Sequence, residues 1–255
     1  MSQFPSSADP VDPPEHSLDC FRSFQFITEN PKWMSNVMFI AVCQFIPFLG
    51  PISILGYQFE VAESLLRQSK PGSYPDFDFN KFVEYLMRGL WPFLVALIMA
   101  MAMIPIIILC VVSMFLFVAA NEAGPNAVGM AAGGILLAVV FVIIVLIVGT
   151  NVLSIPLQLR AGYCQDLGQA FDFRFAMDFL RLMWKETLIA MLFIMISAIP
   201  LMFLGMLMCF VGVYFTMAML MLAQAHLIDF QLYSIYLSKG GTPIPLKEPI
   251  DFAIE

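Results

Sequence analysis

The longest uncharged stretch of this sequence, residues 187–228, sets the main limit on what the chain can fold into. It covers 42 residues without an Asp, Glu, Lys or Arg. As one straight helix it would be roughly 63 Å long at about 1.5 Å per residue. The hydrocarbon core of a bilayer is only about 30 Å thick, which takes about 20 residues to cross. The stretch is therefore too long for one membrane span and suits two, with the turn between Gly205 and Gly212.

Three other uncharged stretches are long enough to cross a bilayer, and they comprise residues 33–59, 89–121 and 123–159. Hydrophobic residues make up 60% of the chain and charged residues 12%, whereas a soluble domain has about half and about a quarter. We therefore expect an all-α, polytopic helical membrane bundle of five spans. Its location would be the cell (cytoplasmic) membrane, with the lipid bilayer as its main partner.

The first predicted span has two alternatives because Pro47 and Gly50-Pro51 interrupt it. Either one kinked helix crosses the bilayer over 33–57, or two half-helices form a re-entrant hairpin, which would give six membrane segments. Gly and Pro are both unfavourable in a helix interior, so the pattern leaves both arrangements open.

Composition divides the chain into one helical membrane domain, 16–238, and two tails. Residues 1–15 combine prolines with acidic residues, so we expect a disordered tail. Residues 239–255 are rich in Gly and Pro and predict an irregular C-terminal tail. Within the domain, 33–105 and 128–200 form a weak internal repeat, although chance similarity between apolar helices would also explain it. The matching pairs are Gly56-Tyr57 with Gly162-Tyr163, Phe77-Asp78-Phe79 with Phe171-Asp172-Phe173, and Trp91 with Trp184.

Lys and Arg are concentrated in two amphipathic connections, 58–90 and 158–185, and are absent from the turns at 120–127 and 205–212. Because short cytoplasmic loops carry the excess of Lys and Arg, we expect both connections and the C-terminus on the cytoplasmic side. The N-terminus lies outside if 33–57 crosses once, and inside if that segment is a re-entrant hairpin.

Ionisable residues inside a membrane bundle are candidates for a functional site. His226 and Asp229 are three positions apart near the cytoplasmic end of the last span, which predicts that they share one helix face. They could relay a proton or hold a cation; alternatively, water or Arg160 satisfies them. Glu60 and Glu63 could gate a cation path, or belong to a solvated helix face that pairs with Arg67.

Uncharged polar residues within the spans also have two interpretations. They form hydrogen bonds between helices, or they line a polar permeation path; the residues are Gln44, Asn151, Gln158 and Ser197. The second interpretation predicts a polar cavity at mid-membrane, framed by the kinks expected at Pro105 and Pro200.

The sequence lacks the motifs of several functional classes. His16 is the only other histidine and no C-x-x-C pair occurs, so we predict neither a metal site with three or more converging ligands nor a cofactor. No G-x-S-x-G, H-E-x-x-H or Walker sequence is present, which leaves no catalytic residues to name and predicts that the protein is not an enzyme. No basic patch indicates nucleic acid as a partner.

Several stretches together are similar to one known family. They are Asn30-Pro31-Lys32-Trp33, Ile46-Pro47-Phe48-Leu49-Gly50, Gly56-Tyr57, Tyr74-Pro75-Asp76-Phe77, and Cys209-Phe210-Val211-Gly212. Over about residues 24–238 the chain resembles the prokaryotic multi-pass membrane proteins catalogued as domain of unknown function 4013. Tyr74 replaces the family's usual Leu before proline, and Glu60 and Glu63 stand where basic residues are usual. The resemblance implies the membrane topology and a prokaryotic origin, and it implies no activity.

Two functions are compatible with these observations. We expect a non-enzymatic scaffold or accessory membrane subunit, with other membrane proteins or further copies of this chain as partners. The alternative is a small-solute or ion transporter or channel that uses polar residues near the cytoplasmic end of the last span. The lack of a convergent ionisable set deep in the spans favours the first function, whereas the repeat and the helix-breaking prolines favour the second.

Overall fold

The computed structural model describes residues 18–67, 74–122, 127–208 and 211–246. These residues form helices and connecting segments and contain no strand, which confirms the expected all-α class. The predicted disordered tail at 1–15 and the end of the predicted irregular tail, 247–255, lie outside the described residues.

Four helices in the described part of the chain are long and apolar enough to cross a membrane, which is roughly consistent with the five spans expected. In an apolar solvent a helix is favoured because it satisfies its own backbone hydrogen bonds. The helices are α4 (Phe82–Glu122), α5 (Ala127–Cys164), α7 (Phe173–Leu207), and α8 (Val211–Gln224) with its continuations η2 (Ala225–Leu232) and α9 (Tyr233–Ser238).

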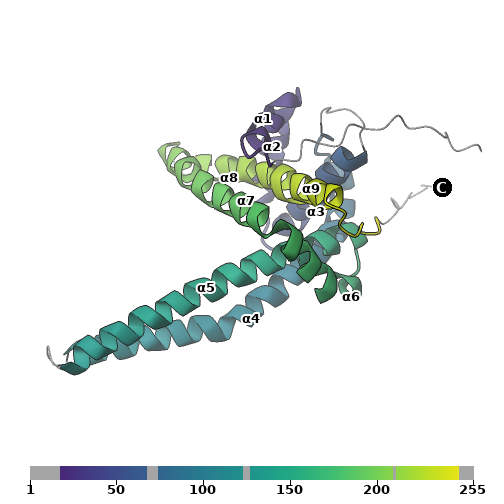
Figure 1. The fold of residues 1–255 in the computed structure, drawn as a ribbon. Helices are drawn as coiled ribbons and strands as arrows, with labels where there is room; N and C mark the ends of the chain where they lie inside the picture. The colour runs from purple at the N-terminus through teal and green to yellow at the C-terminus, as the bar shows by residue number, and fades with distance from the viewer. Residues whose placement is uncertain (1–17, 68–73, 123–126, 209–210, 247–255) are drawn as a thin grey trace, which may run out of the picture.

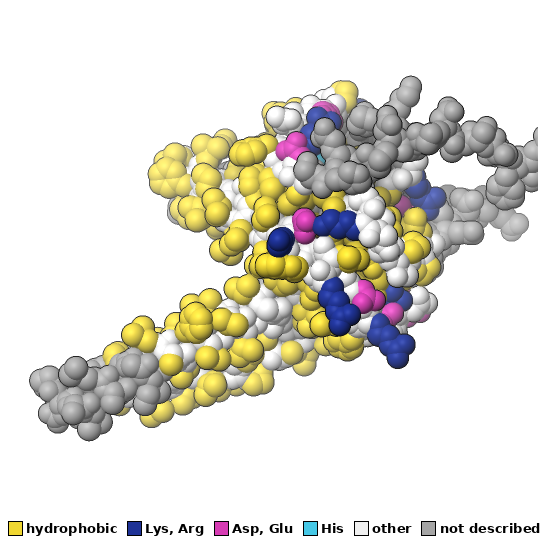
Figure 2. Space-filling model, viewed as in Figure 1, with side chains coloured by type: hydrophobic (Ala, Val, Ile, Leu, Met, Phe, Trp, Pro, Cys, Tyr) yellow, Lys and Arg dark blue, Asp and Glu magenta, His cyan; other side chains and the backbone are white. Residues whose placement is uncertain are grey.

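These helices form two hairpins that project from a common base (Figure 1). One hairpin consists of α4 and α5, and the other of α7 and α8. Figure 2 shows hydrophobic side chains over both hairpins, whereas most of the visible charged side chains gather at the base. We call residues 97–119 of α4 with 137–149 of α5 the arm, and α3 with the segments packed around it the base.

The predicted first span is divided into two helices, α2 (Trp33–Cys43) and α3 (Leu49–Arg67). With 11 residues, α2 is too short to cross a bilayer, which takes about 20. The turn between them holds Phe48 at a φ of 61°, and a side chain at Gly50 would collide with the Cys43 carbonyl oxygen. A single kinked helix over 33–57 is therefore wrong, and entry of the two helices into the membrane as a re-entrant hairpin stays a prediction.

Helix α3 forms the centre of the base because α4 approaches it almost backbone to backbone. A side chain at Gly56 would collide with the Tyr85 carbonyl, and one at Gly89 would collide with the Ile52 carbonyl. Glycine is needed at both positions for this close approach. The Gly56-Tyr57 motif thus marks the α3–α4 contact.

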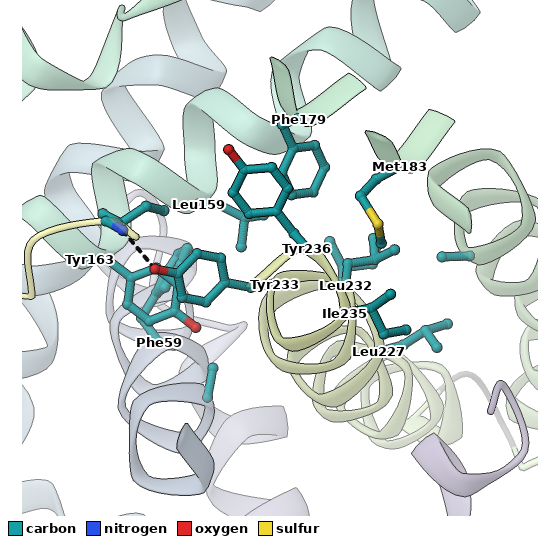
Figure 3. Close-up of a cluster of buried hydrophobic side chains, with 14 of the residues drawn as sticks. Phe59, Leu159, Tyr163, Phe179, Met183, Leu227, Leu232, Tyr233, Ile235 and Tyr236 are labelled. Atoms are coloured by element: carbon teal, nitrogen blue, oxygen red, sulfur yellow. Dashed lines mark hydrogen bonds between the residues drawn. The ribbon is translucent and has the colours of Figure 1, made fainter. Parts of the chain in front are cut away.

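A cluster of buried side chains joins α3 to α5, α7 and the end of the chain (Figure 3). The Phe59 ring lies edge-on to Tyr163 with a centroid distance of 5.5 Å, and a side chain at Gly162 would strike the Phe59 ring. The backbone N–H of Ile244 donates to the Tyr233 hydroxyl at 2.7 Å. The segment after α9 is therefore packed onto the base.

The loop that follows residue 73 is held against α1 (Arg22–Glu29) and α2 by hydrogen bonds. Asn30 Nδ2 donates to the Tyr74 carbonyl at 2.8 Å, and Asn36 Oδ1 accepts from the Phe77 N–H at 3.0 Å. Lys32 Nζ lies 2.8 Å from Asp76 Oδ2. Hydrogen bonds from Lys32 and Asn30 lower the pKa of the Asp76 carboxyl below its ordinary value.

Residues that correspond in the predicted repeat have similar local roles. Asp78 accepts from the Asn80 N–H and begins η1 (Phe79–Lys81), while Asp172 accepts from the Arg174 N–H and begins α7 after the short α6 (Leu167–Ala170). The Tyr57 and Tyr163 hydroxyls both donate to backbone carbonyls, those of Pro75 and Asp229. These similarities concern single residues, and the repeat itself stays a prediction.

The turn between α7 and α8 falls between Gly205 and Gly212, as the uncharged stretch predicts. A Cβ atom at Gly205 would lie 2.7 Å from Val213 Cα, and one at Gly212 would lie 2.8 Å from the Gly205 carbonyl oxygen. Both distances are too short for real atoms, so the two glycines allow the helices to approach closely where the chain reverses.

Candidate functional site

The last span changes its helical form where its ionisable residues lie. After α8 the chain continues as a π-helical segment, η2, which holds both His226 and Asp229, and then returns to an α-helix in α9. Most π-helical segments are short and many occur at functional sites, because the wider turn redirects side chains. This segment is therefore the first place to look for a site.

His226 and Asp229 point to different neighbours. The His226 ring stacks on Phe26 of α1 with a centroid distance of 4.4 Å, and its Nδ1 lies 3.2 Å from Gln231 Nε2. Asp229 instead lines a cavity against α5 and α7. The expectation of one shared face is wrong because it assumed an α-helix, in which positions i and i+3 are neighbours, whereas the wider π-helical turn separates them.

The cavity that Asp229 lines has a volume of about 220 Å³ and lies where α5, α7 and the last span meet. Figure 1 shows α5 and α7 converging toward the base. The lining is partly polar and partly apolar; it comprises Asn151, Ser154, Ile155 and Gln158 of α5, Met191 and Ile194 of α7, Gln224 of α8, and Ile228 and Asp229 of η2.

Asp229 is the only ionisable residue among those that line the cavity, and it is 7% exposed. The Tyr163 hydroxyl donates to its backbone carbonyl at 2.7 Å, which fixes the backbone of η2 against α5. Among the described residues, none forms a hydrogen bond or ion pair with the Asp229 carboxylate. Burial of an unpaired carboxylate is costly in free energy, so the cavity is where this side chain would meet a ligand, water or a proton.

The other two predicted ionisable candidates lie elsewhere and have partners. Arg160 Nη2 lies 3.1 Å from Asp172 Oδ2, and its Nε donates to the Gln169 carbonyl at 2.7 Å. Glu60 lies 3.4 Å from Lys81 Nζ. The four candidate residues His226, Asp229, Glu60 and Arg160 therefore do not form one site, and Arg160 does not satisfy Asp229.

Glu63 is held more firmly than its predicted partner Arg67 alone would hold it. Arg67 Nε donates to Glu63 Oε1 at 2.8 Å, as the amphipathic helix predicts. Arg88 of α4 also pairs with Glu63, and both of these side chains are largely buried. The carboxylate thus ties α3 to α4 beside the glycine contact.

The two prolines expected to frame a cavity do not line the cavity beside Asp229. Pro105 and Pro200 are both exposed, and neither is among the cavity-lining residues. The polar surface is instead provided by Asn151, Ser154 and Gln158, which are three and four positions apart and share one face of α5. The spacing of these three residues could be recognised in the sequence. The residues of α7 and η2 that form the opposite wall of the cavity could not. Among the described residues no group of three or more His, Cys, Asp or Glu side chains is placed to hold a metal ion.

The comparison with protein families gives one match. The family described as Protein of unknown function (DUF4013) matches residues 39–229, which include α3, both hairpins and the cavity-lining part of η2. The comparisons with curated proteins and with solved structures gave no match.

Proposed function

Because this chain belongs to the DUF4013 family and its described residues include four helices able to cross a membrane, we propose that it is a non-enzymatic integral membrane protein. It acts as a scaffold or accessory subunit for other membrane proteins or for further copies of itself. Its membrane is the cell membrane, and the base lies on the cytoplasmic side, because the Lys and Arg residues of both connections gather there.

The main support for this proposal is the exposed apolar surface of the arm. Its two helices pack on each other, and their remaining faces are apolar and exposed: Ile108 is 57%, Phe115 68% and Phe141 67% exposed. Lipid alone can cover such faces when no partner protein is present. Within a bilayer, however, packing between helices drives the association of membrane proteins. A two-helix arm beside an open space (Figure 2) leaves room for the span of another protein.

The charged residues of the base support a structural role. They connect different helical segments: Glu63 pairs with Arg88, Arg160 with Asp172, and Lys239 with Glu186 at 2.7 Å. Ionisable groups that hold the fold together in this way are not free to act as an acid, a base or a nucleophile.

Photo-crosslinking in the native membrane tests the proposal. A photoreactive residue is placed in turn at Ile104, Ile108, Phe115 and Leu116 of the arm. We expect a discrete protein adduct at positions that share one helix face, identified by mass spectrometry and lost when the gene of the identified partner is deleted. Adducts with lipid alone at every arm position would contradict the proposal.

The second candidate function, transport of a small solute or an ion, is favoured by the cavity beside Asp229. Purified protein in liposomes is tested for flux of ions and small solutes, with Asp229→Asn and His226→Ala as variants. Flux that is lost in Asp229→Asn and retained in His226→Ala would favour transport, because only Asp229 lines the cavity. Absence of flux would leave the scaffold function.

A further inference from the structure

We propose that the cavity between α5, α7 and η2 binds a small organic cation, a primary ammonium group that carries a short alkyl chain. This inference does not depend on the scaffold function, because it concerns a site inside the bundle rather than the surface of the arm. It rests on three properties of the lining, which are its charge, its hydrogen-bonding groups and its apolar wall.

The charge of the lining comes from Asp229. This residue is 7% exposed, it lines the cavity, and no described residue pairs with its carboxylate. No Lys or Arg is among the lining residues. A cation in the cavity would therefore meet the Asp229 carboxyl group with no competing positive side chain in the lining, and a buried cation–carboxylate pair forms strong, short hydrogen bonds.

Two of the hydrogen-bonding side chains in the lining, Asn151 and Ser154, are free to accept from a ligand. Asn151 Nδ2 donates to the Ile147 carbonyl at 2.8 Å, so the amide oxygen of this side chain is available to a ligand. Ser154 Oγ donates to the Asn151 carbonyl at 2.8 Å, which leaves its lone pairs available. Because the Ser154 hydroxyl proton and one Asn151 amide proton are committed to the helix itself, these two side chains and the Asp229 carboxylate present acceptors that match a ligand with several N–H donors.

The apolar wall distinguishes an alkylammonium ion from a metal ion. Ile155, Met191, Ile194 and Ile228 line the remainder of the cavity. Its volume of about 220 Å³ is many times the roughly 10–15 Å³ that a single water needs. A bare metal ion would occupy a small part of this space and leave the apolar wall in contact with water, whereas a short alkyl chain covers that wall.

The test uses full-length protein in lipid nanodiscs, titrated with n-butylammonium chloride at constant ionic strength. Thermal unfolding is followed by tryptophan fluorescence. We expect a saturable rise in Tm, because a ligand that binds only the folded state stabilises it. Asp229→Asn should weaken the apparent affinity about tenfold or more, whereas Asp178→Asn, a change at an exposed carboxylate of α7, should leave the affinity unchanged.

A second variant keeps the proposal testable if Asp229→Asn does not fold. Gln158→Leu removes one polar lining group from the cavity and should weaken the affinity several-fold. Butan-1-ol serves as the neutral control, and sodium chloride in place of the amine as the inorganic control. No saturable response to butylammonium, an equal response in Asp229→Asn, or an equal response to butan-1-ol or to sodium would overturn the proposal.

Discussion

The base and the arm both contain long apolar helices, but the surroundings of these helices differ. In the most apolar part of α4, 6% of the residues are buried within the protein, compared with 56% in the most apolar part of the helix from Val211 to Ser238. The base is fixed by glycine contacts, ion pairs and aromatic packing between helices. The arm relies on one facing helix and on the lipid around it. An apolar composition alone therefore does not determine how sensitive a helix is to substitution.

The largest difference is expected when a side chain is added at a glycine. Gly56→Leu would push α4 away from α3, because the new atoms collide with the Tyr85 carbonyl. Overpacking typically costs about 1–3 kcal/mol of stability and occasionally more. We expect a cost at the upper end here, because the colliding Tyr85 carbonyl belongs to the backbone and cannot move aside easily. We expect little folded protein, measured as the monodisperse fraction in size-exclusion chromatography. A Cβ atom added at Gly149 meets no atom within 4 Å, so the matched change Gly149→Leu should be tolerated; equal losses would contradict the comparison.

Breaking the Glu63–Arg88 pair should have the next largest effect. Glu63→Ala leaves the largely buried Arg88 guanidinium without its partner, and loss of one member of a buried pair costs about 3–5 kcal/mol when both groups are fully enclosed. Because these groups are partly exposed and Arg67 is exposed, we expect a smaller loss of about 2–3 kcal/mol in the free energy of unfolding. Chemical unfolding in detergent measures this loss. The double change Glu63→Leu with Arg88→Met should recover much of this loss; no recovery would show that packing, not the unpaired charge, is responsible.

A smaller effect is expected at the hydrogen bond that positions η2. Tyr163→Phe removes the donor to the Asp229 carbonyl, and a single hydrogen bond contributes about 0.5–1.5 kcal/mol to stability. Tyr214→Phe, at a partly exposed position toward the end of the α7–α8 hairpin, should change stability by less. Thermal unfolding of both variants makes the comparison, and an equal effect would argue against a special role for the Tyr163 hydroxyl.

The smallest effect is expected from pH at the edge of the base. The pKa of Asp76 is lowered in the folded protein by Lys32 and Asn30. The carboxylate therefore stabilises the fold above its ordinary pKa of 3.8, and this contribution is lost as the pH falls through the lower folded value. We expect a small decrease in Tm below about pH 4, and a shallower decrease in Asp76→Asn. An identical pH profile in the variant would exclude Asp76 as its source.

The sequence was sufficient to predict the class and the long spans, because the length of an uncharged stretch is measured directly against the thickness of a bilayer. It was not sufficient for the segment around Pro47, where the outcome depends on the φ of Phe48 and on the space at Gly50. It also failed to place His226 and Asp229, since a π-helical segment has no recognisable pattern of residues. The partner of Arg160 lies on another helix, Asp172, and only the packing of α5 against α7 brings the two together.

The contact between Gly56 and Gly89 has a mechanical consequence. Helix α4 runs without interruption through 41 residues, which is about 62 Å at about 1.5 Å per residue, and its glycine contact with α3 lies near one end. Beyond that contact α4 packs on α5, so the two helices of the arm form one long lever whose fulcrum is the glycine contact. A sideways force on the arm would be delivered as torque to α3 and to the helices packed against it.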